Sequence, residues 1–243
     1  QKKADDKSYI LLNASAEIAG NTLYSAFRLF NKNGEQPYTI LKNAFSQYAK
    51  TEFELRHYWD ISRKSRLVTR INTGVGVGYG NSTTLPYIKQ FFVGGPNTLR
   101  AFPFRSVGPG RYTSSVNGGD INPIEQTGDI KLVMNAEYRF EIYEFIKMAL
   151  FVDAGNVWLL KNDPNRPDGN FKFNEFYQQL AIGTGAGLRL DFDFFVIRAD
   201  LGIPLYKPYV NEGNRWINEF PESNFKDWRK SNFVWNIAIG YPF

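Results

Sequence analysis

The stretch Arg66-Leu-Val-Thr-Arg-Ile-Asn-Thr-Gly-Val-Gly-Val-Gly-Tyr-Gly80 decides the fold class of this chain. Its odd-numbered positions are apolar residues or Thr, whereas its even-numbered positions include two Arg, one Asn and four Gly. Side chains of a strand point to opposite faces with a period of two, so this pattern predicts a strand with one apolar and one polar face. Because Gly weakens a strand, a row of Gly on the polar face indicates that another segment lies against that face.

Seven further stretches show the same alternation. They are residues 9–18, 45–59, 130–142, 146–155, 180–190, 195–205 and 235–243. A second row of Gly, at 183, 185 and 187, again falls on the polar side. These strands reach about 10 residues or more, whereas strands of soluble proteins cluster near 5–6 residues. The sequence therefore predicts eight long antiparallel strands.

The connections between these strands alternate in length. The short ones are 61–65, 143–145 and 191–194, and the long ones are 20–44, 81–127, 161–175 and 207–232. Short turns at one end and long loops at the other are typical of an outer-membrane β-barrel. A soluble β-sandwich with one solvated face is the alternative. Strand length, Gly rows and alternating loops together favour an all-β, transmembrane antiparallel β-barrel.

Composition excludes several classes of protein. Among 243 residues there is no Cys, one His (His57) and two Met, so a disulfide scaffold, a His/Cys zinc site and a Ser-His triad have no candidates. The net charge of +5 is spread along the chain, which gives no nucleic-acid footprint. Gly74–Gly80 superficially resembles a nucleotide-binding loop, but no helix follows it. We expect no catalytic residue, enzyme activity, metal, cofactor or nucleic-acid partner.

The second of these long connections, 81–127, does not have the composition of an exposed loop. It contains Phe91-Phe-Val-Gly-Gly-Pro-Asn-Thr-Leu-Arg-Ala-Phe-Pro-Phe-Arg105, which is rich in aromatic and turn-forming residues. Apolar surface of this extent is expected to pack against another part of the protein. The nearby Gly-lined polar faces of the strands offer such a place, so we expect this loop to insert into the barrel lumen.

The same loop carries a family resemblance. Its motif residues are Gly94, Gly95, Leu99, Arg100, Ala101 and Phe102, followed by Val107-Gly-Pro109. They resemble the lumen-inserted loop of the BamA/TamA-like outer-membrane assembly-factor superfamily of bacterial surface antigen type. In that family the loop tip reads Val/Ile-Arg-Gly-Phe/Tyr, so Ala101 departs from the usual Gly. The strands around Asn135-Ala-Glu-Tyr-Arg-Phe140 and Phe151-Val-Asp-Ala-Gly-Asn-Val-Trp158 are also similar to that family.

Two carboxylates are candidate anchors for the loop. Glu137 and Asp153 both fall on polar faces when the strands are divided by periodicity alone. An Arg in a lumen needs anionic partners because an unpaired buried charge costs several kcal/mol, and a guanidinium can bridge two carboxylates. We expect Arg100 to bind both and to pin the loop. The alternative is that the two carboxylates bind Arg139 or Lys147.

The chain is expected to form only part of a barrel. A closed eight-stranded barrel has room only for its own side chains, and a loop of more than forty residues cannot share that space. The resemblance implies a barrel with about twice as many strands, of which residues 1–243 match the C-terminal half. It also implies periplasmic POTRA modules, which are not found in this chain. Because an unpaired edge in lipid is costly, we expect an N-terminal barrel half, on the same or another chain, to pair with both edges.

The last residues are candidate seam residues and a C-terminal signal. These are Gly240, Tyr241, Pro242 and Phe243. Pro242 has no N–H to donate and Gly240 packs nothing, so a seam here would have few hydrogen bonds and could open to admit a client strand by β-augmentation. The alternative is that the Pro simply ends the strand.

The resemblance implies a function and a location. The function is the folding and insertion of client outer-membrane proteins, and the location is the outer membrane of a Gram-negative-type bacterium, in contact with its lipids. Two alternatives stay open: a two-partner-secretion-type export pore of the same superfamily, and a small structural outer-membrane barrel. Residues 1–7 lack the apolar core of a signal peptide, so either that peptide has been removed or the chain begins within a longer protein.

Overall fold

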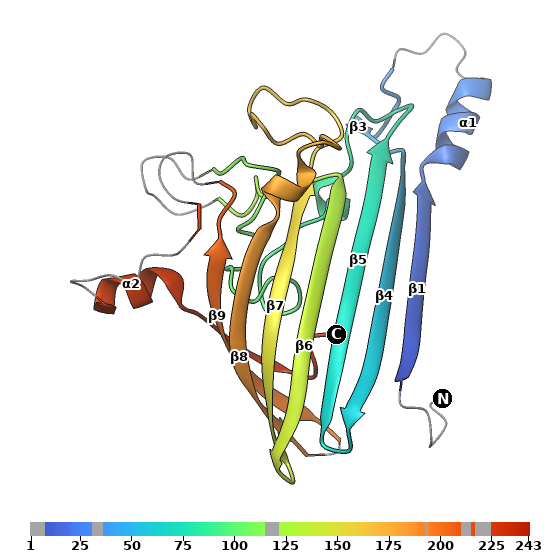
Figure 1. The fold of residues 1–243 in the computed structure, drawn as a ribbon. Helices are drawn as coiled ribbons and strands as arrows, with labels where there is room; N and C mark the ends of the chain where they lie inside the picture. The colour runs from blue at the N-terminus through green and yellow to red at the C-terminus, as the bar shows by residue number, and fades with distance from the viewer. Residues whose placement is uncertain (1–7, 31–35, 115–121, 193, 210–214, 217–224) are drawn as a thin grey trace.

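The fold is an eight-stranded antiparallel sheet curved around an internal loop (Figure 1). The computed structural model describes residues 8–30, 36–114, 122–192, 194–209, 215–216 and 225–243. The elements are β1 (Ser8–Ala19), α1 (Asn21–Phe30), β2 (Thr39–Ile40), β3 (Asn43–Ala44), β4 (Tyr48–Ser62), β5 (Ser65–Gly78), a 3-10 helix (Tyr87–Lys89), β6 (Ile130–Tyr143), β7 (Ile146–Trp158), a second 3-10 helix (Phe176–Gln179), β8 (Ala181–Asp191), β9 (Val196–Tyr206), α2 (Phe225–Asn232) and β10 (Val234–Ile239).

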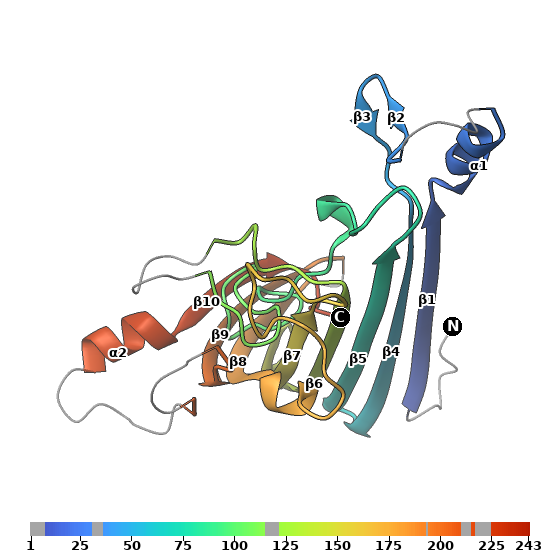
Figure 2. The same ribbon diagram turned by 90° about the horizontal axis from the view of Figure 1, so that it is seen from above.

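The large sheet is an up-and-down meander. Its strand order is β1-β4-β5-β6-β7-β8-β9-β10, and β2 and β3 form a separate small hairpin. Strands β1 and β10 lie at opposite ends of this order, and Figure 2 shows the gap between them. The sheet therefore does not close into an eight-stranded barrel. It is an open sheet that forms a partial barrel. The eight predicted strands are confirmed, and only the last one ends well before its predicted boundary.

The two faces of the sheet have the burial that the alternation predicts. In β6 the side chains of Val133 and Glu137 point inward and are 0% exposed. The opposite face presents large apolar side chains, and Leu150, Val152 and Ile237 are 50%, 48% and 80% exposed. An apolar outer face around a polar, filled interior is the pattern of a membrane barrel rather than of a soluble sandwich. In the part of the chain that the structure describes, no helix has the length and apolar character needed to cross a membrane.

The core lies between the concave face of the sheet and the loop 81–127, which we call the lumen loop. Its buried apolar side chains are Phe91, Val93, Leu99, Ala101, Phe102 and Val107 from the loop, with Val133, Val157 and Ala181 from the sheet. The loop follows β5 and crosses the concave side before the chain enters β6 (Figures 1 and 2). The described residues of the loop thus fill the interior, as the sequence predicts.

Contact with the loop, the predicted reason for the rows of Gly, is confirmed at some of these positions. A Cβ added at Gly74 would lie 2.5 Å from the Phe91 ring, and one at Gly183 would lie 2.3 Å from the Cβ of Ala101. At these positions the loop needs the space that a side chain would occupy. At Gly185 and Gly187 the added Cβ would instead meet Leu201, Phe151, Asp200 and Arg189 of the sheet itself. The second Gly row therefore relieves crowding within the sheet as well as against the loop.

Candidate functional site

The tip of the lumen loop is a compact turn built on two glycines. Gly94 and Gly95 have φ angles of +103° and +91°, which only Gly adopts readily. The Gly95 N–H donates to the carbonyl of Phe102 at 2.8 Å. The Thr98 hydroxyl donates to the Gly94 carbonyl at 2.9 Å and accepts from its N–H at 3.0 Å. The turn presents Leu99-Arg-Ala-Phe102 to the sheet, with every side chain of the four at most 1% exposed.

Arg100 contacts both predicted carboxylates. Its Nε and Nη2 donate to the two carboxylate oxygens of Asp153 at 2.9 and 2.8 Å, and its backbone N–H donates to Asp153 at 3.0 Å. Its Nη1 donates to Glu137. The two carboxylates are 0% exposed and come from neighbouring strands β6 and β7. The structure thus brings Arg100 of the loop motif together with the two carboxylates that periodicity placed on the polar face.

The alternative prediction, in which Arg139 or Lys147 binds these carboxylates, is only partly correct. Arg139 donates to Glu137 at 2.7 Å, but it does so in addition to Arg100. Lys147 binds Asp191 at 2.6 Å instead of either candidate carboxylate. Glu137 therefore bridges the loop and the strand that carries it.

An aromatic ring completes the environment of the Arg100 guanidinium. The Phe151 ring centroid lies 3.7 Å from its central carbon. A guanidinium over an aromatic face is stabilised by the ring quadrupole, most strongly where water is excluded. Phe151 stands two residues before Asp153, on the same inward face of β7, so one strand supplies both the carboxylate and the ring.

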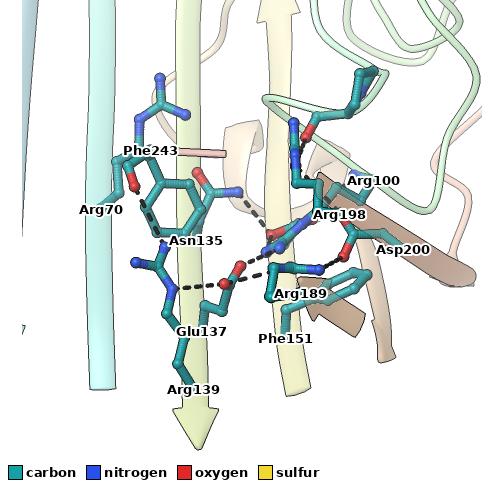
Figure 3. Close-up of polar contacts among 12 residues, drawn as sticks. Arg70, Arg100, Asn135, Glu137, Arg139, Phe151, Arg189, Arg198, Asp200 and Phe243 are labelled. Carbon is teal, nitrogen blue, oxygen red and sulfur yellow. Dashed lines mark hydrogen bonds and ion pairs between the residues drawn. The ribbon is translucent and has the colours of Figure 1, made fainter. Parts of the chain in front are cut away.

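A second set of charges holds the backbone next to the tip (Figure 3). Arg198 donates to the carbonyl of Pro96 at 2.8 Å, and Arg70 donates to the carbonyl of Asn97 at 2.8 Å. Asp200 binds Arg198 at 3.2 Å and Arg189 at 2.6 Å. Sequence patterning does not single out Arg70 or Arg198 as loop contacts. The available signal is that both fall on polar faces of their strands.

The cluster is suited to anchoring rather than to chemistry on a substrate. Its fully buried ions are Arg100, Arg189, Arg198, Glu137, Asp153 and Asp200, with Arg139 at 9% exposure. Guanidinium groups stay charged at any physiological pH and bind carboxylates with two parallel hydrogen bonds. Among the described residues, no group of three or more His, Cys, Asp or Glu side chains is placed to hold a metal ion.

Ala101 fits the loop tip although it departs from the family pattern. Ala101 is not among the described residues with a positive φ, so its backbone conformation does not require Gly. Room for its methyl group comes from Gly183 on β8, where a Cβ would approach it to 2.3 Å. The departure therefore leaves the placement of Arg100 unchanged.

The base of the loop is tied to the sheet and to itself. Phe91 and Gly128 exchange two backbone hydrogen bonds of 2.9 Å. Farther along, the hydroxyl of Tyr112 donates to Glu125 at 2.5 Å, and burial together with this contact raises the pKa of Tyr112 to about 12. Residues 115–121 of the predicted lumen loop lie outside the described residues.

The predicted seam residues lie in a different place from the one expected. Strand β10 ends at Ile239, and Gly240 adopts a φ of +87°. Phe243 is 6% exposed and packs inside the sheet with Tyr58 and Val68. The prediction of one alternating strand over 235–243 is therefore wrong for its last four residues.

The reason for this departure is local backbone chemistry. A positive φ at Gly240 breaks the period-two alternation, and Pro242 has no N–H with which to continue a ladder. The chain end therefore turns into the concave face, where the main-chain oxygen of Phe243 accepts a hydrogen bond from Arg139 at 3.3 Å. Figures 1 and 2 show the C-terminus there, and Figure 3 shows Phe243 beside Arg70 and Arg139. Pro242 thus lies outside the ladder that it was expected to weaken.

Comparisons with known proteins agree with this architecture. Residues 27–237 match the Omp85 superfamily domain. The outer membrane protein assembly factor BamA of Neisseria meningitidis serogroup B is 26% identical over 117 residues, which are 46% of this chain and 14% of that protein.

Two solved structures align with most of this chain. The crystal structure of BamA from Haemophilus ducreyi lacking POTRA domains 1-3 aligns with a TM-score of 0.50 at 14% identity, over 85% of this chain and 40% of that one. CdiB from Acinetobacter baumannii aligns with a TM-score of 0.38 at 15% identity, over 80% of this chain and 33% of that one. The chain spans well under two thirds of the length of each of these proteins.

Proposed function

The chain belongs to the Omp85 superfamily, and we propose that it is the C-terminal barrel portion of a factor that folds and inserts other β-barrel proteins into the outer membrane of a Gram-negative-type bacterium. The similarity to the assembly factor BamA supports this role. On this proposal the client proteins are unfolded outer-membrane barrels. The work is done by strand pairing and membrane contact, without a catalytic residue, a metal or a cofactor.

The observation that carries the proposal is the short terminal strand. Strand β10 pairs with β9 at six positions, Val234–Ile239, whereas β4 and β5 pair at fourteen. Each backbone hydrogen bond contributes about 0.5–1.5 kcal/mol net, so the β10 edge is the least costly part of the sheet to separate. A strand edge with unpaired backbone groups can accept an added strand from a client by β-augmentation.

The open edges call for further protein. In lipid each unsatisfied backbone group costs several kcal/mol, so β1 and β10 need partners on their outer sides. We propose that an N-terminal barrel half, on the same or another chain, supplies them, together with periplasmic modules that receive clients. The exposed apolar side chains of the outer face then contact outer-membrane lipids.

A reconstitution experiment tests the assembly role. The complete protein, in liposomes of outer-membrane lipids, is mixed with an unfolded porin, and folding is followed by the heat-modifiable shift of the porin on a gel. We expect folding to be faster than in empty liposomes and in liposomes that carry an unrelated barrel. Folding rates equal to those controls would contradict the proposal.

Depletion of this protein in the cell distinguishes the assembly role from the secretion alternative. Accumulation of several unfolded outer-membrane proteins on depletion is the result expected for an assembly factor. Loss of a single exported protein, with porins folded normally, would instead identify a two-partner-secretion-type pore of the same superfamily.

A further inference from the structure

Strand β10 is held by more than its pairing with β9. Asn236, in the middle of the strand, points into the concave face and donates from Nδ2 to the backbone carbonyl of Arg100 at 2.8 Å. This hydrogen bond joins residues 136 positions apart, and it connects the weakest strand of the sheet to the tip of the lumen loop.

The loop tip also lies directly on the strand next to β10. A Cβ added at Gly202 of β9 would lie 2.5 Å from the Arg100 carbonyl oxygen and 2.6 Å from the Cα of Ala101. Gly202 pairs with Val234, and the neighbouring Asp200 pairs with Asn236. Because Gly202 has no side chain, the loop tip can lie directly against β9. The Arg100 carbonyl is then within hydrogen-bonding distance of Asn236.

Arg100 cannot move away without disrupting the buried cluster. Its guanidinium and its backbone N–H are both bound to Asp153, and its Nη1 is bound to Glu137. The carbonyl that Asn236 binds belongs to the same residue, so it is fixed by β6 and β7 on the other side of the loop.

We propose that Asn236 is a positioning residue that clasps strand β10 to the pinned loop tip, so that the strand and the loop move as one unit. Separation of β10 from β9 then requires loss of the Asn236–Arg100 hydrogen bond, and release of the loop tip loosens β10. The inference concerns how the strand is held, and it can be tested whether or not the proposed assembly function is correct.

Hydrogen exchange tests whether the Asn236–Arg100 hydrogen bond holds strand β10 in place. The complete protein is placed in lipid nanodiscs, and the amide exchange rates of residues 235–239 are compared between the natural protein and Asn236→Ala. Loss of one hydrogen bond of about 1 kcal/mol is expected to raise these rates about fivefold. Val234→Ala is the matched control, since Val234 is a half-buried residue of the same strand and face, and it is expected to change them less than about twofold.

The Arg100→Ala variant tests whether Asn236 acts through the pinned loop tip. In Arg100→Ala the tip is no longer pinned, so adding Asn236→Ala is expected to raise the exchange of residues 235–239 by less than about twofold further, as coupled residues do. Equal effects of Asn236→Ala in both backgrounds would overturn the proposal, as would unchanged exchange in the single variant.

Gly202→Ala gives an independent check with Asn236 intact. The added methyl group must displace the loop tip, so the exchange of residues 235–239 is expected to rise as in Asn236→Ala. Gly76→Ala is its control, because the atoms nearest to the new Cβ there belong to the Leu85 side chain, at 2.6 Å, near the start of the loop. Exchange in β10 that rises equally in both Gly variants would show general loosening of the sheet rather than a clasp.

Discussion

Strands β6 and β1 carry the same period-two alternation, but only β6 has buried inward side chains. Val133 on the inward face of β6 is 0% exposed, whereas Leu11 on the inward face of β1 is 44% exposed. No residue of β1 is buried, although the strand pairs with β4 along its whole length. The difference is the lumen loop, which packs against β5 to β9. Strand pairing forms the sheet, but contact with the loop makes one region of it a core.

The largest expected effect comes from removing the loop anchor. Arg100→Ala leaves Glu137 and Asp153 buried without their shared cation, and breaking a buried ion pair from one side costs about 3–5 kcal/mol. The covered region should then behave like the β1 edge, with a lumen loop that is cleaved readily. Limited proteolysis and urea unfolding measure both consequences.

The control for this prediction lies in the same loop. Arg105 stacks over Phe92 at 4.2 Å and binds Tyr87 at an exposed position, so Arg105→Ala should leave the loop resistant. A loop that stays equally resistant in Arg100→Ala would show that the apolar contacts alone retain it.

A smaller effect is expected from neutralising one carboxylate. Glu137 is 0% exposed and contacts Arg100, Arg139 and Arg189. Glu137→Gln keeps the shape but removes the charge that these hydrogen bonds depend on, at a cost of about 1.5–3 kcal/mol.

Glu141→Gln on the same strand is the matched case. Glu141 pairs with Lys64 near the surface, where an ion pair contributes about 0–1 kcal/mol. The free energies of unfolding of both variants are compared in urea. Equal losses would mean that burial of the cluster adds nothing to its contribution.

A packing change at the loop tip tests the fit between Ala101 and β8. Gly183→Ala places a methyl group 2.3 Å from the Cβ of Ala101, and overpacking of this kind costs about 1–3 kcal/mol. Ala101→Gly removes the opposing methyl group, so the double variant should recover most of the loss. The unfolding midpoints of the single and double variants check this. Failure of the second change to restore stability would place the strain elsewhere.

The smallest expected effect comes from single cysteines that compare the accessibility of β1 and β6. Cysteines are introduced one at a time as Leu11→Cys and Val133→Cys, both on inward faces, in a chain that has no Cys of its own. A water-soluble maleimide should label the first and spare the second, since only Val133 is covered by the loop. The Leu11 change is expected to alter stability by less than about 0.5 kcal/mol. Protection at both positions would indicate that another segment covers β1 from inside.

Much of this protein follows from its sequence. The period-two alternation determined the number of strands, their faces and the exposure of an apolar surface, because side-chain direction in a strand is fixed locally by the backbone. The same reasoning placed Glu137 and Asp153 on the polar side. The resemblance of the loop tip to the family motif singled out Arg100, and together these two inferences predicted the contact between them.

Only the tertiary structure decided the rest. The hydrogen bonds from Arg70 and Arg198 to loop carbonyls, and from Asn236 to Arg100, depend on which backbone surfaces meet across the concave face. The contact of Phe243 with Tyr58 and Val68 depends on the same meeting of surfaces. Such contacts join residues far apart in the chain, and the space for them is set by the packing of the loop against the sheet. Alternation carries no information about that packing, since it describes the two sides of each strand and not what covers them.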